Sequence, residues 1–174
     1  MNLRQTPAVL VLLALATSAL AAASPATATE IWPGRPFGFA KASFANPTLP
    51  ANQDRITPLV WITRGNTQGI YNIAQEAAFT MNVSPKDTRW ATGDAVNHAS
   101  LTFQPWQGWT ANTPQATIGV NAVVHLISED IYIDIVFDAF GGGGTGGAFA
   151  YRRGVRPATP TRPTTWGRIK TLYR

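Results

Sequence analysis

The segment Ala122–Phe140, AVVHLISEDIYIDIVFDAF, contains two apolar runs separated by the polar tripeptide 128–130. In the second run, apolar side chains alternate with mostly polar ones, a period of two that is typical of a strand with one buried face. The first run is rich in β-branched residues, which favour strands. The segment therefore predicts a β-hairpin at the centre of a sheet, with Asp134 and Asp138 on its solvent face.

Several other short segments show strand-like composition and are separated by turns rich in Gly, Pro and Asn. Arg64–Gly69 predicts the turn of a second hairpin, because its glycines and asparagine accept a positive φ. No helical period is sustained and no repeat is visible, so the sequence predicts an all-β fold, an antiparallel, jelly-roll-like β-sandwich. The expected strands lie at 37–44, 55–63, 70–74, 90–93, 100–104 and 148–151.

The two ends of the chain differ in composition from the middle. Arg4, the apolar run 8–23 and the small residues at 26–28 form the pattern of a secretory signal peptide, residues 1–28. The apolar run is shorter than the roughly 20 residues of a membrane-spanning helix. The expected organisation is the leader, an extended lead-in at 29–50, a β-sandwich domain at 51–153, and a disordered Pro/Thr/Arg-rich tail at 154–174 with a short helical pattern at its end. This predicts a secreted protein, located outside the cell, at its surface or in the periplasm.

Charge is unevenly distributed between the predicted domain and the tail. Residues 29–151 contain six Lys and Arg against nine acids, whereas residues 152–174 contain seven Lys and Arg and no acid. We expect the basic tail to meet an anionic surface or to act as a tether or sorting element. A nucleic-acid partner is not expected behind a signal peptide, and the mature chain contains no stretch typical of a transmembrane helix. The absence of cysteine excludes thiol nucleophiles and thiolate metal sites.

Two acidic residues at the hairpin break, Glu129 and Asp130, are the candidate metal ligands. Carboxylate oxygens suit Ca²⁺, and Asp134 and Asp138 follow on the same strand. A calcium site needs at least about six converging oxygens, however, and the spacing of an EF-hand is missing. The favoured interpretation is a tight turn and a solvated strand face, with no cofactor.

A loop with two tryptophans, Trp106 and Trp109, is the candidate carbohydrate site. Exposed aromatic rings can stack on sugars, and nearby amides can orient them. The alternative is that these tryptophans fill the core, as we expect for Trp61. Arg64 and Asn66 give a second candidate, a polar ligand site at a hairpin end, and the alternative there is an Arg64–Glu76 ion pair that holds the turn.

Catalytic signatures are missing from the sequence. No GxSxG motif surrounds a serine, and a carboxylate pair such as Glu76 with Asp134 cannot be placed at a catalytic separation from sequence alone. The sequence leaves open whether the protein is an enzyme and favours a protein without catalytic activity. The sequence thus predicts a secreted, non-catalytic structural or adhesive module. The alternative is a carbohydrate-binding module or glycan hydrolase of β-sandwich fold, with an extracellular glycan or cell-surface polymer as partner.

Four pieces of the sequence together resemble an uncharacterised β-rich domain of exported bacterial proteins: ANQDRITPLVWITRGNTQGIYNIAQE, SLTFQPW, VVHLISEDIYIDIVF and GGGGTGGAFAYRR. The resemblance covers roughly residues 51–153. The closing TTWGRIKTLYR is similar to a terminal element of some exported proteins. Ala139-Phe140 departs from the pattern, which more usually has an aromatic such as Trp beside the glycine run. The resemblance implies a secreted β-rich domain and no particular chemistry.

Deletion of residues 155–174 tests the role of the tail. We expect the shortened protein to change its location among the medium, cell-surface and periplasmic fractions, because the tail carries the cationic excess. Its circular dichroism spectrum should stay that of the parent protein. An unchanged location would contradict a tethering or sorting role.

Overall fold

The computed structural model describes residues 28–158. Residues 1–27 of the predicted leader and the helical pattern after residue 164 lie outside this range. Within it, no helix is both long enough and apolar enough to cross a bilayer. The chain is mostly β-structure with antiparallel pairing and few helices, as the all-β prediction states.

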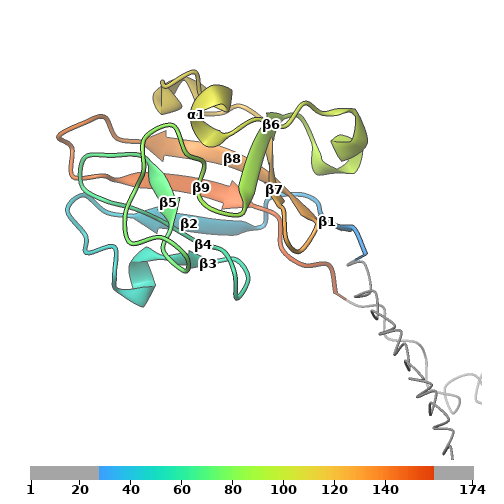
Figure 1. Ribbon diagram of the computed structural model, residues 1–174, viewed down its shortest axis with the longest axis horizontal. Helices are drawn as coiled ribbons and strands as arrows, with labels where there is room; N and C mark the ends of the chain where they lie inside the picture. The colour runs from blue at the N-terminus through green and yellow to red at the C-terminus, as the bar shows by residue number, and fades with distance from the viewer. Residues whose placement is uncertain (1–27, 159–174) are drawn as a thin grey trace, which may run out of the picture.

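The elements follow one another as short strands joined by turns and short helices (Figure 1). The strands are β1 Glu30–Trp32, β2 Phe37–Lys41, β3 Asp54–Arg55, β4 Trp61–Arg64, β5 Ile70–Asn72, β6 Thr88–Thr92, β7 Ala122–Leu126, β8 Ile131–Phe140 and β9 Phe149–Arg153. The helices are α1 Trp106–Trp109 and the 3-10 helices η1 Pro50–Asn52, η2 Ala95–Ser100 and η3 Pro114–Thr117.

Strand β8 is the central strand of the larger sheet, whose order is β2-β9-β8-β7-β6. Its first half pairs with β7 in an antiparallel register that sets Ile133 opposite Val124, so the predicted central hairpin is confirmed. The second half pairs with β9. The first three residues also pair with β1, in parallel. The lead-in is therefore part of this sheet, since β1 and the edge strand β2 both belong to it.

The smaller sheet, β3-β4-β5, contains the second predicted hairpin. Ile62 pairs with Asn72 and Arg64 with Ile70, so the turn between β4 and β5 lies where the glycines predict it. The strand expected at 55–63 is not continuous, and it is interrupted around Pro58, the residue from which the sequence predicts an edge or a bulge. The chain turns around Pro58 and pairs Arg55 with Trp61, because proline cannot donate the ladder hydrogen bond that a continuous strand requires.

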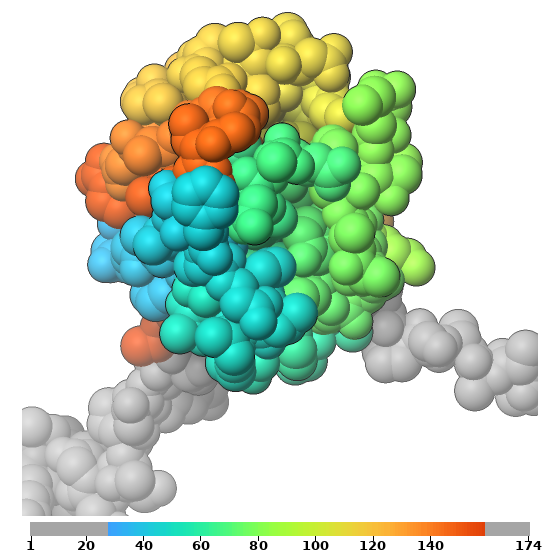
Figure 2. Space-filling view, turned by 90° about the vertical axis from the view of Figure 1, so that its left-hand side faces the viewer, coloured from blue at the N-terminus to red at the C-terminus, as the bar shows by residue number. Residues whose placement is uncertain are grey.

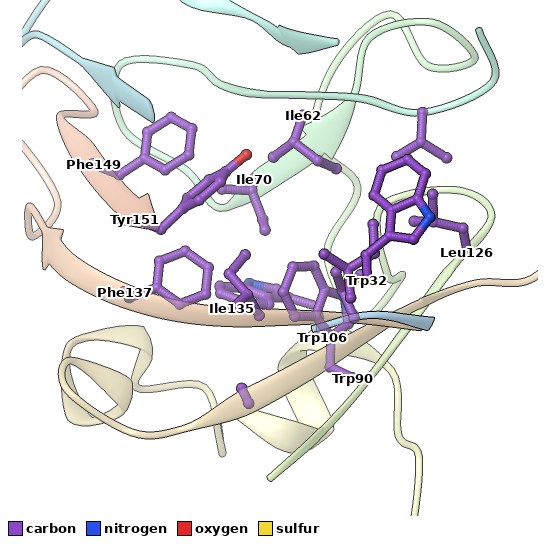
Figure 3. Close-up of a cluster of buried hydrophobic side chains, with 14 of the residues drawn as sticks. Trp32, Ile62, Ile70, Trp90, Trp106, Leu126, Ile135, Phe137, Phe149 and Tyr151 are labelled. Carbon is purple, nitrogen blue, oxygen red and sulfur yellow. The ribbon is translucent and has the colours of Figure 1, made fainter. Parts of the chain in front are cut away.

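The two sheets share one hydrophobic core (Figure 3). Ile62 and Ile70 of the smaller sheet point into the same space as Ile135, Phe137 and Tyr151 of the larger sheet. All five side chains are buried, as the period-two pattern predicts for Ile135 and Phe137 of β8. Fully burying one such side chain is worth about 1.5–3 kcal/mol.

The opposite face of β8 is less exposed than the sequence predicts. Asp134 and Val136 are buried there, whereas Asp138 is exposed. The Asp134 carboxylate accepts hydrogen bonds from the backbone N–H groups of Ala95, at 2.6 Å, and Gly34, at 2.8 Å. Placing Asp134 on the solvent face was therefore wrong. It fastens η2 and the β1–β2 turn to the outside of the sheet.

The segment between β6 and β7 departs furthest from prediction. Residues 100–104 do not form a strand of a sheet. Ser100 is the last residue of η2, and the rest of the segment makes one isolated bridge, between Gln104 and Trp90. The expected loop after Pro105 contains α1 and η3. Proline at position 105 stops the chain from pairing further and leaves it free to begin a helical turn.

A buried ion pair joins the two sheets. Asp54 of β3 accepts two hydrogen bonds from Arg153 of β9, at 2.6 and 2.7 Å, and a third from the Tyr151 hydroxyl at 2.7 Å. Burial alone lowers the pKa of Arg153, but hydrogen bonding and charge from Asp54 raise it above its usual value. Burial and the Asp54 charge also raise the pKa of Tyr151, so the hydroxyl stays protonated as a donor.

Three of the basic residues assigned to the tail by composition are paired within the fold. Arg152 contacts Asp138, Arg153 contacts Asp54, and Arg156 contacts Glu30. The cationic excess of the chain beyond residue 151 is thus partly neutralised. The other four Lys and Arg residues of this segment come after residue 158 and lie outside the described range.

Asp54→Ala tests the buried pair. We expect it to lower the free energy of unfolding by about 3–5 kcal/mol, because Arg153 would be left charged in a buried site. Asp138→Ala is the matched control, since it removes the carboxylate of the exposed pair with Arg152 and should cost at most about 1 kcal/mol. Urea unfolding measures both variants. Equal losses would show that the buried pair has no special role.

Candidate functional site

A pocket of about 210 Å³ lies between the β4–β5 turn and the helical segment α1–η3. Its lining combines one charged group with aromatic rings, amides and hydroxyls. We name it the Arg64 pocket. It is lined by Arg64, Thr67, Gln68, Gly69, Phe79, Trp106, Gln107, Thr110, Asn112, Pro114, Gln115 and Phe140.

Arg64, the last residue of β4, supplies the charge of this pocket. Its side chain is only 3% exposed, and its guanidinium lies over the Phe140 ring, 4.0 Å from the centroid. Nε donates to the carbonyl of Gln68 at 2.5 Å, and Nη1 donates to the carbonyl of Ala148 at 2.9 Å. Burial lowers the pKa of Arg64 to about 10, so the group is still charged at neutral pH.

Arg64 forms no ion pair with any Asp or Glu of residues 28–158. Lys41 is buried nearby, and over the same range it also has no acidic partner. Its Nζ makes one long contact of 3.4 Å with the carbonyl of Ala42. Burial and the Arg64 charge lower the pKa of Lys41. Buried cations usually have a carboxylate partner. Because Arg64 and Lys41 both lack one among residues 28–158, the space around them has an excess of positive charge.

The glycine-rich segment 141–147 positions the carbonyl of the next residue, Ala148, which accepts a hydrogen bond from Arg64. Gly146 and Gly147 are buried at positive φ values of 74° and 69°. A Cβ at Gly147 would lie 1.8 Å from the carbonyl oxygen of Gly65 in the β4–β5 turn. Figure 2 shows the orange β8–β9 loop against the cyan and green segments of the β2–β5 region. Glycine therefore lets two loops meet, and this contact brings Ala148 to Arg64.

The tryptophans near the pocket do not form the exposed platform that was considered for Trp106 and Trp109. Trp106 is 1% exposed, its ring lies 4.8 Å from that of Trp90, and it belongs to the core. Trp109 is half-buried, is not part of the pocket lining, and is tilted 49° from Trp106. Of the two interpretations of Trp106, the structure confirms the one in which it fills the core, and an exposed platform that includes Trp106 is excluded. Trp61, expected in the core, is instead half-buried under Arg55.

Amide side chains surround the open part of the pocket. Gln68, Gln107, Asn112 and Gln115 contribute to its lining. The Oε1 atom of Gln107 is buried without a hydrogen-bond partner in residues 28–158. A buried carbonyl oxygen without a partner costs free energy, so a ligand that donates a hydrogen bond to it would recover that loss. The period-two pattern gave no indication of this segment, because α1 and η3 are single helical turns.

The predicted hairpin-end residues separate in the structure. Asn66 is exposed and outside the pocket lining, whereas Arg64 lines it. The expected Arg64–Glu76 ion pair is wrong, because Glu76 accepts hydrogen bonds from the backbone N–H groups of Asn72, at 2.7 Å, and Lys86, at 2.8 Å. Asn72 is fully buried, and its side chain bonds to the backbone of Leu59, Trp61 and Lys86.

The candidate metal ligands have protein partners. Glu129 accepts from the Thr57 hydroxyl at 2.5 Å. Asp130 contacts Thr29 and His125, and hydrogen bonding by Thr29, partly opposed by burial, lowers its pKa. Residues 28–158 contain no group of three or more His, Cys, Asp or Glu residues arranged to hold a metal ion.

The carboxylates considered for acid–base chemistry are also committed to backbone groups. Glu76 and Asp134 each accept two backbone N–H groups from different loops. A carboxylate fixed in this way serves as a structural acceptor. Neither residue lines the Arg64 pocket.

Comparisons with known proteins returned no relative. No protein-family model, no curated protein and no solved structure matches this chain. The resemblance to exported bacterial domains gains no support from these comparisons and stays a prediction. The function must therefore be inferred from the site itself.

Gly147→Ala tests the loop contact that builds the pocket. The methyl group would collide with Gly65, so we expect a stability loss greater than the about 1–2 kcal/mol that a positive φ costs by itself. Gly144→Ala is the control, because Gly144 also has a positive φ, of 82°, but nothing lies within 4 Å of the added carbon. Thermal unfolding compares the two. Equal losses would contradict a close contact at Gly147.

Proposed function

We propose that this chain is an exported, non-catalytic adhesive module that binds a carbohydrate in the Arg64 pocket. The observation that carries the proposal is the composition of that pocket. It joins aromatic faces, from Trp106, Phe79 and Phe140, with a ring of amide and hydroxyl side chains. Apolar faces next to a few oriented polar groups are the usual make-up of a small-molecule site.

The size of the pocket supports a small ligand. A volume of about 210 Å³ is below the range of roughly 300–1,000 Å³ that is usual for drug-sized ligands. It suits one pyranose ring, whose hydroxyls both donate and accept hydrogen bonds. The amides of Gln107, Gln115 and Asn112 also do both, which matches the chemistry of a sugar.

The wider role follows from the arrangement of the chain. The predicted leader ends at Ala28, and β1 begins two residues later at Glu30, so export and folding of the mature domain are compatible. Two sheets around one core support the finer fold proposal, an antiparallel, jelly-roll-like β-sandwich. A location outside the cell and a basic tail that contacts an anionic surface belong to the same proposal.

A glycan array with the mature chain, residues 29–174, tests this proposal. We expect binding to a subset of glycans, with the double variant Gln107→Ala/Gln115→Ala weakening it at least about 10-fold through the loss of two or more hydrogen bonds. Trp106→Ala is unsuitable as a probe, because removing a buried tryptophan costs about 3–5 kcal/mol of stability.

Asn121→Ala is the control for that measurement. Asn121 is exposed and lies outside the pocket lining, so its removal should leave glycan binding unchanged. Equal losses in the two proteins, or an array with no bound glycan, would contradict the proposal.

A further inference from the structure

Arg64 and Lys41 are the two buried cations on β-strands that have no acidic partner among residues 28–158, and of the two only Arg64 lines the pocket. Arg153 has Asp54, and Asp134 has two backbone donors. Arg64 has two carbonyl acceptors and, among residues 28–158, no acid. Carbonyl dipoles satisfy N–H groups but leave the charge uncompensated, and a charge removed from water needs an opposite charge to offset desolvation.

The guanidinium of Arg64 has one nitrogen without a protein acceptor in the described residues, and Arg64 lines a pocket. Nε and Nη1 are occupied by Gln68 and Ala148, and Nη2 donates to no atom of residues 28–158. Arg64 nevertheless lines the cavity, next to the carbonyl-rich turn that fixes its orientation. A group held in this way is pre-organised, so a ligand that reaches Nη2 loses little free energy in ordering the side chain.

The nature of the anion follows from the rest of the lining. Arg64 is the one Lys or Arg among the lining residues, and Lys41 is not part of the lining. Phosphate sites commonly combine several cations or backbone N–H groups at a helix N-terminus. A single guanidinium among amides instead suits one planar, singly charged carboxylate.

We propose that the ligand of the Arg64 pocket is a carboxylate-bearing sugar of the uronic acid class, with its carboxylate on Arg64 and its hydroxyls on the surrounding amides. This inference rests on the proposed carbohydrate-binding function and narrows it. The carboxylate neutralises Arg64 and reduces the repulsion between Arg64 and the buried Lys41. The unpaired Oε1 of Gln107 accepts a hydrogen bond from a ring hydroxyl.

The test compares charged and neutral forms of the same sugar on the unaltered chain, residues 29–174. Galacturonate and glucuronate are titrated against their methyl esters and against galactose and glucose, and the side-chain amide NMR signals of Gln107 and Gln115 report binding. We expect each acid to bind about 10-fold or more tightly than its ester, because a charged hydrogen bond is lost in the ester. No variant is needed, so a folding defect cannot mimic the result.

A matched substitution adds a second readout. Arg64→Lys keeps the positive charge but removes the planar fork, so we expect it to reduce the preference for the acid over the ester to less than about 3-fold. Its unfolding curve shows whether the variant is folded before binding is compared.

The outcomes separate this inference from the proposed function. Equal binding of acids, esters and neutral sugars would contradict a role of the ligand carboxylate, but it would still support a carbohydrate site. If a short peptide with a free C-terminal carboxylate binds more tightly than either uronate, the ligand is not a sugar and the inference is contradicted. No shift with any sugar overturns the proposed function, and the inference with it.

Discussion

Strand β8 supplies the backbone pairing on which the larger sheet depends. It pairs with β7 along its first half, with β9 along its second half, and with β1 at its start. A strand with partners on both edges has its N–H and C=O groups satisfied, which allows its side chains to be buried on both faces. This explains why Asp134 and Val136, on the face away from the core, are buried as well.

Buried polar groups then fix how the remaining elements attach to this sheet. Asp134 binds η2 and the β1–β2 turn from outside, and the Asp54–Arg153 pair joins the smaller sheet from inside. Asp54 has a charged partner in Arg153 and Asp134 has two backbone donors, so these contacts specify position while both carboxylates are hydrogen-bonded. Without a disulfide, such contacts and the core carry the whole tertiary arrangement.

Against this background, the Arg64 region is the exception that indicates function. Its guanidinium is buried, oriented by two carbonyls, and unmatched by an acid among residues 28–158. The loops around it meet at close glycine contacts, between Gly147 and the backbone of Gly65 and between Gly69 and the Phe79 ring. Of the two buried strand cations without an acid in this range, Arg64 and Lys41, Arg64 is the one that lines a cavity, and this arrangement favours a ligand there.

The sequence by itself determined the all-β class and both hairpins, because side-chain alternation and turn chemistry are local properties of β8 and of Arg64–Gly69. It identified Arg64 as a candidate, but it paired that residue with Glu76, and it left open whether Trp106 fills the core or lies on the surface. Only the tertiary structure decided these points. Distant segments that pack around a tryptophan decide whether it is buried in the core or exposed on a binding platform. In the same way, they decide whether an arginine has an acidic partner. Local spacing carries no information about the Gly147–Gly65 contact that builds the pocket.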